Sequence, residues 1–178
     1  MKFHETKLNG LFLIEQEPRI DERGYFVRIF CEDEFKKAGI KDFNIVQGNQ
    51  SLTKKKGTIR GMHFQKEPKA EDKFLQCLKG AIYDVVIDLR ESSPTFGQWC
   101  ANELSEANKR MLFIPKGFAH GFQALSDDCL IEYFMSEFYV PDHADGVRWD
   151  DPFFNISWPI AKPSVMSDND KKWPLMKK

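Results

Sequence analysis

The chain has 178 residues, 42% hydrophobic and 13% aromatic, which is enough to bury the core of one globular domain over residues 1–178. Its 26 basic and 27 acidic residues leave a formal charge of −1, which excludes the net positive field that recruits nucleic acid or an anionic membrane. Without a bilayer-spanning apolar run, a signal peptide or a Cys-x-x-Cys pair, we expect a cytoplasmic protein with four unpaired cysteines.

Short apolar runs follow one another along the chain, separated by polar turns. Residues 81–89 alternate most regularly, with apolar side chains on one face and Asp84 and Asp88 on the other, which is the period of a strand. Many short strands predict an all-β sandwich or barrel. Helix predictions are limited to 32–38, 105–109 and 168–172. The other predicted strands are 11–14, 25–30, 43–46, 58–64, 74–78, 99–104, 111–114, 119–125 and 129–139.

The strand at 58–65 carries polar groups that a plain core does not accept. Arg60 and His63 must each find a partner or meet a ligand, and Gly61 lets the backbone bend or a ligand come close. Arg60 and His63 are three positions apart, so they need not point the same way on a regular strand. An edge strand with a solvated arginine and a hydrogen-bonded histidine is the simpler alternative for this segment alone.

Other polar residues interrupt apolar strands in the same way, and a small barrel has an interior that can hold one ligand. The alternative is that most of them lie on a solvated face and that His120, between Ala119 and Gly121, is a satisfied core residue. The residues concerned are Arg23, Arg28, Gln47, Asn49, Lys73, His120 and Tyr133.

Several common chemical signatures are missing from the sequence. No His-x-His pair follows the pattern of metal-binding β-barrels, because Phe64 and Gln65 follow His63. No glycine-rich dinucleotide motif and no Gly-x-Ser-x-Gly elbow is present. We therefore predict a site with no metal and no cofactor.

Motifs spread along nearly the whole chain resemble those of the nucleotide-sugar 3,5-epimerases, the family of dTDP-4-dehydrorhamnose 3,5-epimerase. They lie at 21–24 (DERG), 60–65 (RGMHFQ), 88–97, 104–108, 114–122 (IPKGFAHGF) and 148–152 (RWDDP). The resemblance implies a cupin-type double-stranded β-helix, which is a jelly-roll barrel, with a few short helices. It also implies a homodimer whose N-terminal strands exchange between subunits.

The resemblance further implies a reaction on a nucleotide-diphosphate sugar. In a 4-keto-6-deoxy sugar, the ketone acidifies the hydrogens at C3 and C5, and inversion needs a base, an acid on the opposite face and a group that holds the enolate. By resemblance His63 is the base, Asp170 orients it and Tyr133 is the acid. Lys73 and His120 stabilise O4.

The same resemblance assigns the remainder of the substrate site. Arg23 and Arg60 bind the diphosphate, which suits a planar guanidinium, and Gln47 and Asn49 lie along the nucleotide. The further substrate-binding residues that it implies are Phe26, Arg28, Phe138 and Tyr139.

Some positions depart from the pattern of the rhamnose-pathway enzymes. Arg28 replaces Glu, Gly48 and Gln50 replace Asp and His, and Phe138 replaces Tyr. The leading prediction is conversion of dTDP-4-dehydro-6-deoxy-D-glucose to dTDP-4-dehydro-L-rhamnose. The alternatives are a single-centre epimerase on a CDP-linked or other nucleotide sugar, and a non-catalytic barrel that binds a nucleotide sugar. The four catalytic residues of the resemblance are all present, which argues against the last.

Overall fold

Thirteen strands and two short α-helices make up the protein in a computed structural model that describes residues 1–176. The helices are α1 (Glu32–Lys37) and α2 (Asp168–Lys172), with one 3-10 turn, η1 (Pro141–His143). The strands are β1 (Lys2–Glu5), β2 (Phe12–Glu15), β3 (Arg19–Asp21), β4 (Gly24–Phe26), β5 (Gln47–Thr53), β6 (Ile59–Gln65), β7 (Lys73–Lys79), β8 (Ala81–Asp88), β9 (Trp99–Ser105), β10 (Arg110–Ile114), β11 (Phe118–Ala124), β12 (Cys129–Met135) and β13 (Ala144–Gly146).

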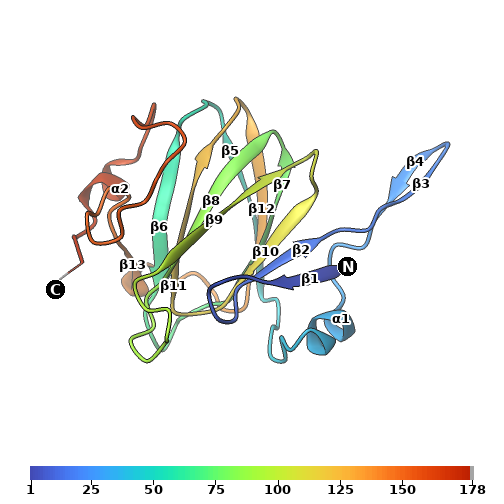
Figure 1. Ribbon diagram of the computed structural model, residues 1–178, viewed down its shortest axis with the longest axis horizontal. Coiled ribbons are helices and arrows are strands. Elements are labelled where there is room, and N and C mark those ends of the chain that lie inside the picture. Colours follow the sequence, from blue (N-terminus) through green and yellow to red (C-terminus); the bar gives the residue numbers. More distant parts are fainter. Residues whose placement is uncertain (177–178) are drawn as a thin grey trace.

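Two antiparallel sheets face each other and form the barrel (Figure 1). One has the strand order β1-β2-β10-β7-β12-β5 and the other β13-β6-β11-β8-β9. Buried side chains from both sheets, such as Leu75, Leu112 and Ile131 from the first and Ile82 and Phe122 from the second, share one hydrophobic cluster. The sequence prediction of an all-β jelly-roll barrel with few helices is confirmed.

The helix predictions at 32–38 and 168–172 are confirmed by α1 and α2, but the prediction at 105–109 is wrong. There the backbone N–H of Ser105 donates to Asn108 Oδ1 at 3.0 Å, and the N–H of Asn108 donates to Ser105 Oγ at 3.1 Å. These reciprocal bonds close a turn between β9 and β10, because short polar side chains compete with helical hydrogen bonding.

Three strand predictions also need correction. Residues 43–46 form no strand, and the side chain of Phe43 instead packs in an aromatic cluster with Phe35, Phe74 and Phe113. The strand predicted at 25–30 ends at Phe26, and the one predicted at 129–139 ends at Met135. Strand β5, which directly follows 43–46, was not predicted.

A bulge in β6 decides which of its side chains face the barrel interior. His63 pairs with His120 and Arg60 pairs with Phe122, so β6 advances three residues while β11 advances two. An extra residue in one strand inverts the alternation of side chains beyond it. Arg60 and His63 therefore both line the interior. At Gly61, with φ of 134°, a Cβ would lie 2.5 Å from the Gly121 Cα, so only glycine fits this close strand contact.

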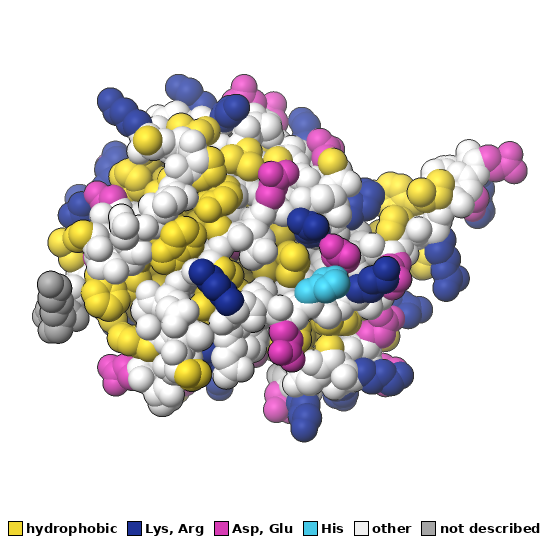
Figure 2. All heavy atoms as spheres, viewed as in Figure 1, with side chains coloured by type: hydrophobic (Ala, Val, Ile, Leu, Met, Phe, Trp, Pro, Cys, Tyr) yellow, Lys and Arg dark blue, Asp and Glu magenta, His cyan; other side chains and the backbone are white. Residues whose placement is uncertain are grey.

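Two segments lie outside the barrel. The β3–β4 hairpin projects away from it (Figures 1 and 2), and its Ile20 and Phe26 are 81% and 70% exposed. Residues 164–176, here called the C-terminal strap, lie beside β6 on the side of the barrel away from the hairpin (Figure 1), and several of them line the cavity described below. The Val165 carbonyl accepts from Ile59 N at 3.1 Å, and Met176 N donates to Asp151 Oδ2 at 2.6 Å, so both ends of the strap are anchored. Within residues 1–176, no helix is long and apolar enough to cross a bilayer.

Candidate active site

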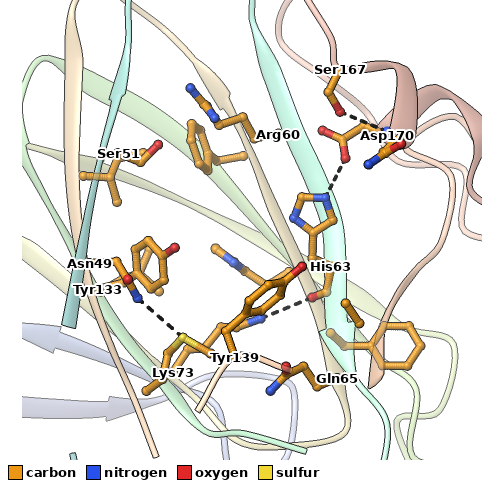
Figure 3. A pocket seen from close by; sticks show the side chains of 18 of the residues that line it. Asn49, Ser51, Arg60, His63, Gln65, Lys73, Tyr133, Tyr139, Ser167 and Asp170 are labelled. Carbon is orange, nitrogen blue, oxygen red and sulfur yellow. Dashed lines mark hydrogen bonds and ion pairs between the residues drawn. The ribbon is translucent and has the colours of Figure 1, made fainter. Parts of the chain in front are cut away.

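A cavity of about 940 Å³ opens between the two sheets and beneath the C-terminal strap. This is a volume typical of small-molecule sites. Strands from both sheets line it, so residues far apart in the sequence meet there (Figure 3). Nine of the predicted site residues line this cavity: Gln47, Asn49, Arg60, His63, Lys73, His120, Tyr133, Tyr139 and Asp170.

His63 and Asp170 form a hydrogen-bonded pair at the strap. His63 Nε2 lies 2.6 Å from Asp170 Oδ1, and the other imidazole nitrogen faces the cavity (Figure 3). Asp170 is placed by α2, where its backbone N–H donates to the capping Ser167 Oγ at 3.1 Å. Burial alone would raise the pKa of Asp170, but hydrogen bonds from His63 and Gly61 hold that pKa below its ordinary value. An ionised carboxylate behind an imidazole orients it and supports its protonation, as a base requires.

Lys73 lies on β7, in the opposite sheet from His63. Its Nζ is 2.8 Å from Glu71 Oε1 and 3.4 Å from the His63 carbonyl oxygen. The side chains of both Lys73 and Glu71 are largely buried, at 13% and 3% exposed. The ammonium therefore keeps a partner and a fixed direction, with a third N–H left for a ligand. Glu71 was not predicted, although its position two residues before Lys73 is a signal that both share a face.

His120 forms a second histidine–aspartate pair with Asp84 of β8. His120 Nε2 lies 2.7 Å from Asp84 Oδ2, and Asp84 is completely buried. Burial raises the pKa of Asp84, and the charges of His120 and Lys73 oppose only part of that rise. The alternation of residues 81–89 predicted that Asp84 lies on the face of the strand opposite its apolar side chains. That side proves to be buried too, and it supports His120.

Tyr133 projects into the cavity from β12, on the wall opposite His63 (Figure 3). Burial raises the pKa of its phenol, and the charge of Arg60 opposes part of the rise, so the hydroxyl carries its proton at neutral pH. Arg60 donates through Nε to Thr53 Oγ1 at 3.0 Å and through Nη2 to the Leu52 carbonyl at 3.1 Å. These bonds orient the guanidinium and leave other N–H groups for an anion.

Gln47 and Asn49 stand side by side on β5, with weak partners. Gln47 Nε2 donates to Asn49 Oδ1 at 3.2 Å, and the nearest acceptor for Asn49 Nδ2 is the thioether of Met135 at 3.6 Å. Sulfur is a weak acceptor, so the amide nitrogens of both residues can readily change partner and donate to a ligand.

Four predicted substrate-binding residues do not line the cavity of their own chain. Arg23 and Phe26 lie on the projecting hairpin, Arg28 pairs with Glu34 at 2.7 Å, and Phe138 is 59% exposed. Among residues 1–176, no cluster of three or more His, Cys, Asp or Glu side chains is placed to hold a metal ion.

The fold and the cavity together define a cupin-type barrel whose cavity brings together histidine, carboxylate and tyrosine side chains, the groups that acid–base chemistry uses. The family model of dTDP-4-dehydrorhamnose 3,5-epimerase matches residues 5–178. The chain therefore belongs to the dTDP-4-dehydrorhamnose 3,5-epimerase family, whose members are isomerases.

Similar proteins agree in sequence and in structure. The dTDP-4-dehydrorhamnose 3,5-epimerase of Methanothermobacter thermautotrophicus is 42% identical, over 97% of this chain and 92% of its own length. The crystal structure of that enzyme from Bacillus anthracis, with TDP and PPi bound, has a TM-score of 0.95 and 43% identity, covering 98% of this chain and 99% of that one. The epimerase from Legionella pneumophila, in complex with dTDP-4-keto-L-rhamnose, has a TM-score of 0.92 and 36% identity, covering 98% and 92%.

Proposed function

We propose that this epimerase acts on a dTDP-linked 4-keto-6-deoxy sugar and inverts both C3 and C5, converting dTDP-4-dehydro-6-deoxy-D-glucose to dTDP-4-dehydro-L-rhamnose. One observation carries the proposal. The His63–Asp170 pair and the Tyr133 hydroxyl lie on opposite walls of one cavity, on strands of opposite sheets. Inversion requires that a proton leave one face of the sugar and return to the other. The dTDP sugar bound to the Legionella relative supports the choice of nucleotide.

The proposed chemistry uses only proton transfers. His63 removes the hydrogen beside the ketone through the imidazole nitrogen that faces the cavity, and the electron pair moves to O4 to form an enolate. Lys73 and His120 donate hydrogen bonds to O4, where the negative charge develops. Tyr133 delivers a proton to the same carbon from the other side, and solvent restores both groups. The same proton transfers then take place at the second carbon.

Arg60, Gln47 and Asn49 bind the nucleotide half of the substrate in this proposal. Arg60 is already held by two hydrogen bonds, so little conformational entropy is lost when it meets the diphosphate. The amide nitrogens give up only a thioether and the Asn49 oxygen when they meet the nucleotide, while Gln47 Oε1 keeps its hydrogen bond from Tyr139 N.

We further propose a cytoplasmic homodimer in which the β3–β4 hairpin of one subunit reaches the cavity of its partner. Arg23, with its side chain 87% exposed, and Phe26 then serve the neighbouring site. The exposed apolar side chains of this hairpin, Ile20, Tyr25 and Phe26, support this assembly, because exposed apolar patches mark interaction surfaces. Mixed dimers of Arg23→Ala and His63→Ala subunits should recover activity, since one site in each mixed dimer is then intact. No recovery on mixing would argue that Arg23 serves its own chain.

Proton NMR in D₂O tests the reaction directly. With dTDP-, CDP- and GDP-linked 4-keto-6-deoxy sugars offered in turn, we expect H3 and H5 of the dTDP sugar to exchange and both centres to invert. Exchange at one position alone would indicate a single-centre epimerase. Faster exchange of the CDP- or GDP-linked sugar would show that the enzyme prefers that nucleotide over dTDP. If no sugar exchanged while a nucleotide sugar still bound, the protein would be a non-catalytic barrel.

A further inference from the structure

Gln65 ends β6 two residues after His63 and belongs to the RGMHFQ motif, yet the chemistry above gives it no role. Its side chain is buried, and every polar atom of its amide is used. Nε2 donates to the carbonyls of Lys69 at 2.9 Å and Phe138 at 3.2 Å, and Oε1 accepts from Val140 N at 2.6 Å. One side chain therefore holds two loops against the base-bearing strand.

The bonded groups at Phe138 and Val140 flank Tyr139, whose side chain lines the cavity beside Lys73 in the view of Figure 3. The Tyr139 N–H itself donates to Gln47 Oε1 at 3.1 Å. This segment lies between β12 and η1, outside any regular strand. Gln65 from one sheet and Gln47 from the other therefore replace the ladder bonds that a strand would supply.

We propose that Gln65 is a positioning residue that fixes Tyr139 at the cavity mouth, so that the tyrosine closes over the bound sugar nucleotide. The inference rests on the proposed function and deepens it. The peptide groups on both sides of Tyr139 are bonded to one buried amide, which fixes the backbone from which its side chain enters the cavity. Loss of those bonds leaves the base and the acid in place but loosens the contact with substrate. The effect should thus fall on KM more than on kcat.

A second buried glutamine offers a matched control. Gln123 of β11 is fully buried, and its amide bridges a single residue, donating to the Ile160 carbonyl and accepting from Ile160 N, both at 2.8 Å. Ile160 does not line the cavity. Gln65→Met and Gln123→Met each remove a buried side-chain bridge to the backbone, but only the first frees a cavity residue.

Steady-state kinetics on the dTDP sugar separate the two glutamines. Gln65→Met should raise KM about tenfold, which corresponds to the net free energy of about one hydrogen bond. Its kcat should change less than its KM. Gln123→Met should lower Tm by about as much as Gln65→Met does, but it should leave KM unchanged. Adding Gln65→Met to Tyr139→Ala should raise KM no further, because the residue being positioned is already gone. Equal KM changes in the two glutamine variants, or additive effects with Tyr139→Ala, would overturn the inference.

The position of Tyr139 can also be measured without substrate, so this inference can be tested separately from the proposed function. The chain has four tyrosines, so fluorotyrosine labelling gives few ¹⁹F resonances, and Tyr139→Phe assigns the relevant one. That resonance should sharpen and move toward the free amino acid in Gln65→Met, and stay in place in Gln123→Met. If Gln65→Met does not fold, Gln65→Glu serves, since it keeps the acceptor for Val140 and loses both donors. An unmoved resonance refutes positioning, whereas absent turnover by the native enzyme refutes only the proposed function.

Discussion

The two histidine–aspartate pairs have nearly the same geometry and opposite electrostatics. Their histidines are direct cross-strand neighbours on β6 and β11, and the nitrogen–oxygen distances are 2.6 and 2.7 Å. The pKa of Asp170 is lowered, because hydrogen bonds from His63 and Gly61 outweigh burial. The pKa of Asp84 is raised, because its burial is complete and its Oδ1 has no partner within the described chain.

The difference teaches that distance alone does not define a catalytic pair. The His63 side chain is 45% exposed and that of His120 only 15%, which favours His63 as the residue that exchanges protons with substrate and solvent. A firmly ionised Asp170 supports a histidine that gains a proton. A buried Asp84 instead anchors His120 as a fixed hydrogen-bond donor. The predictions below test this division of roles.

The largest effect is expected from the two histidines. His63→Ala removes the proposed base and should reduce both solvent exchange and inversion by about 10⁴-fold, at the upper end for a general base. His120→Ala removes one donor to the enolate oxygen and should cost about 10²-fold. Deuterium exchange at C3 and C5, followed by NMR, measures both. Equal losses would mean that the two pairs are not functionally distinct.

Tyr133→Phe should separate exchange from inversion. The ring stays and only the hydroxyl is lost, so His63 still forms the enolate and returns a solvent proton to the same face. We expect inversion to fall about 10²-fold while deuterium enters the substrate faster than either centre inverts. If the variant lost exchange and inversion equally while His63→Ala kept exchange, the acid and base roles would be reversed.

Asp170→Asn should weaken exchange and inversion together, by about 10–10²-fold, the value of one charge-assisted hydrogen bond. The pKa of Asp170 is lower in the folded state, so its stabilising contribution is present above about pH 4 and is lost as the pH falls through the folded value. The Tm deficit of the variant should therefore be full at pH 7 and shrink in acid. A deficit independent of pH would show that packing, not charge, is responsible.

Asp84→Asn should have the smallest effect on activity, less than about tenfold, and should raise stability. The folded state favours the protonated form of Asp84, so its ionisation costs stability as the pH rises above about 4. The neutral amide removes that cost, and Tm at pH 7 should increase by about 2 °C or more. The gain should disappear in acid.

Asp88 provides the control on the same strand. It is equally buried, but bonds from Arg90, Ser93 and Thr95 outweigh burial and lower its pKa to about 2. Asp88→Asn should therefore lower Tm at pH 7, the opposite sign. Destabilisation by both substitutions would indicate that Asp84 is ionised and useful in the folded protein.

The sequence predicted the strands whose apolar pattern indicates burial, including the cavity-lining β6, β7, β11 and β12, but it missed one cavity-lining strand with polar inward positions. Alternation identified β8, but β5 was missed because its inward residues are Gln47, Asn49 and Ser51. A strand that lines a binding site carries polar side chains where the pattern expects apolar ones.

The site was predictable only in part for a similar reason. His63 and Asp170 are 107 positions apart, and no local rule links them, so the pair came from family resemblance alone. Glu71 and Asp84 are charges inside apolar strands, but whether such a charge is solvated or paired depends on a neighbour that the sequence does not position. The placement of Arg23 and Phe26 away from their own cavity could not be read from the chain either.

The bulge at Gly61 has a consequence for engineering this scaffold. On a strand without this bulge, residues three positions apart, such as Arg60 and His63, would point to opposite faces. A grafted copy of the strand must therefore carry its irregular spacing as well as its side chains.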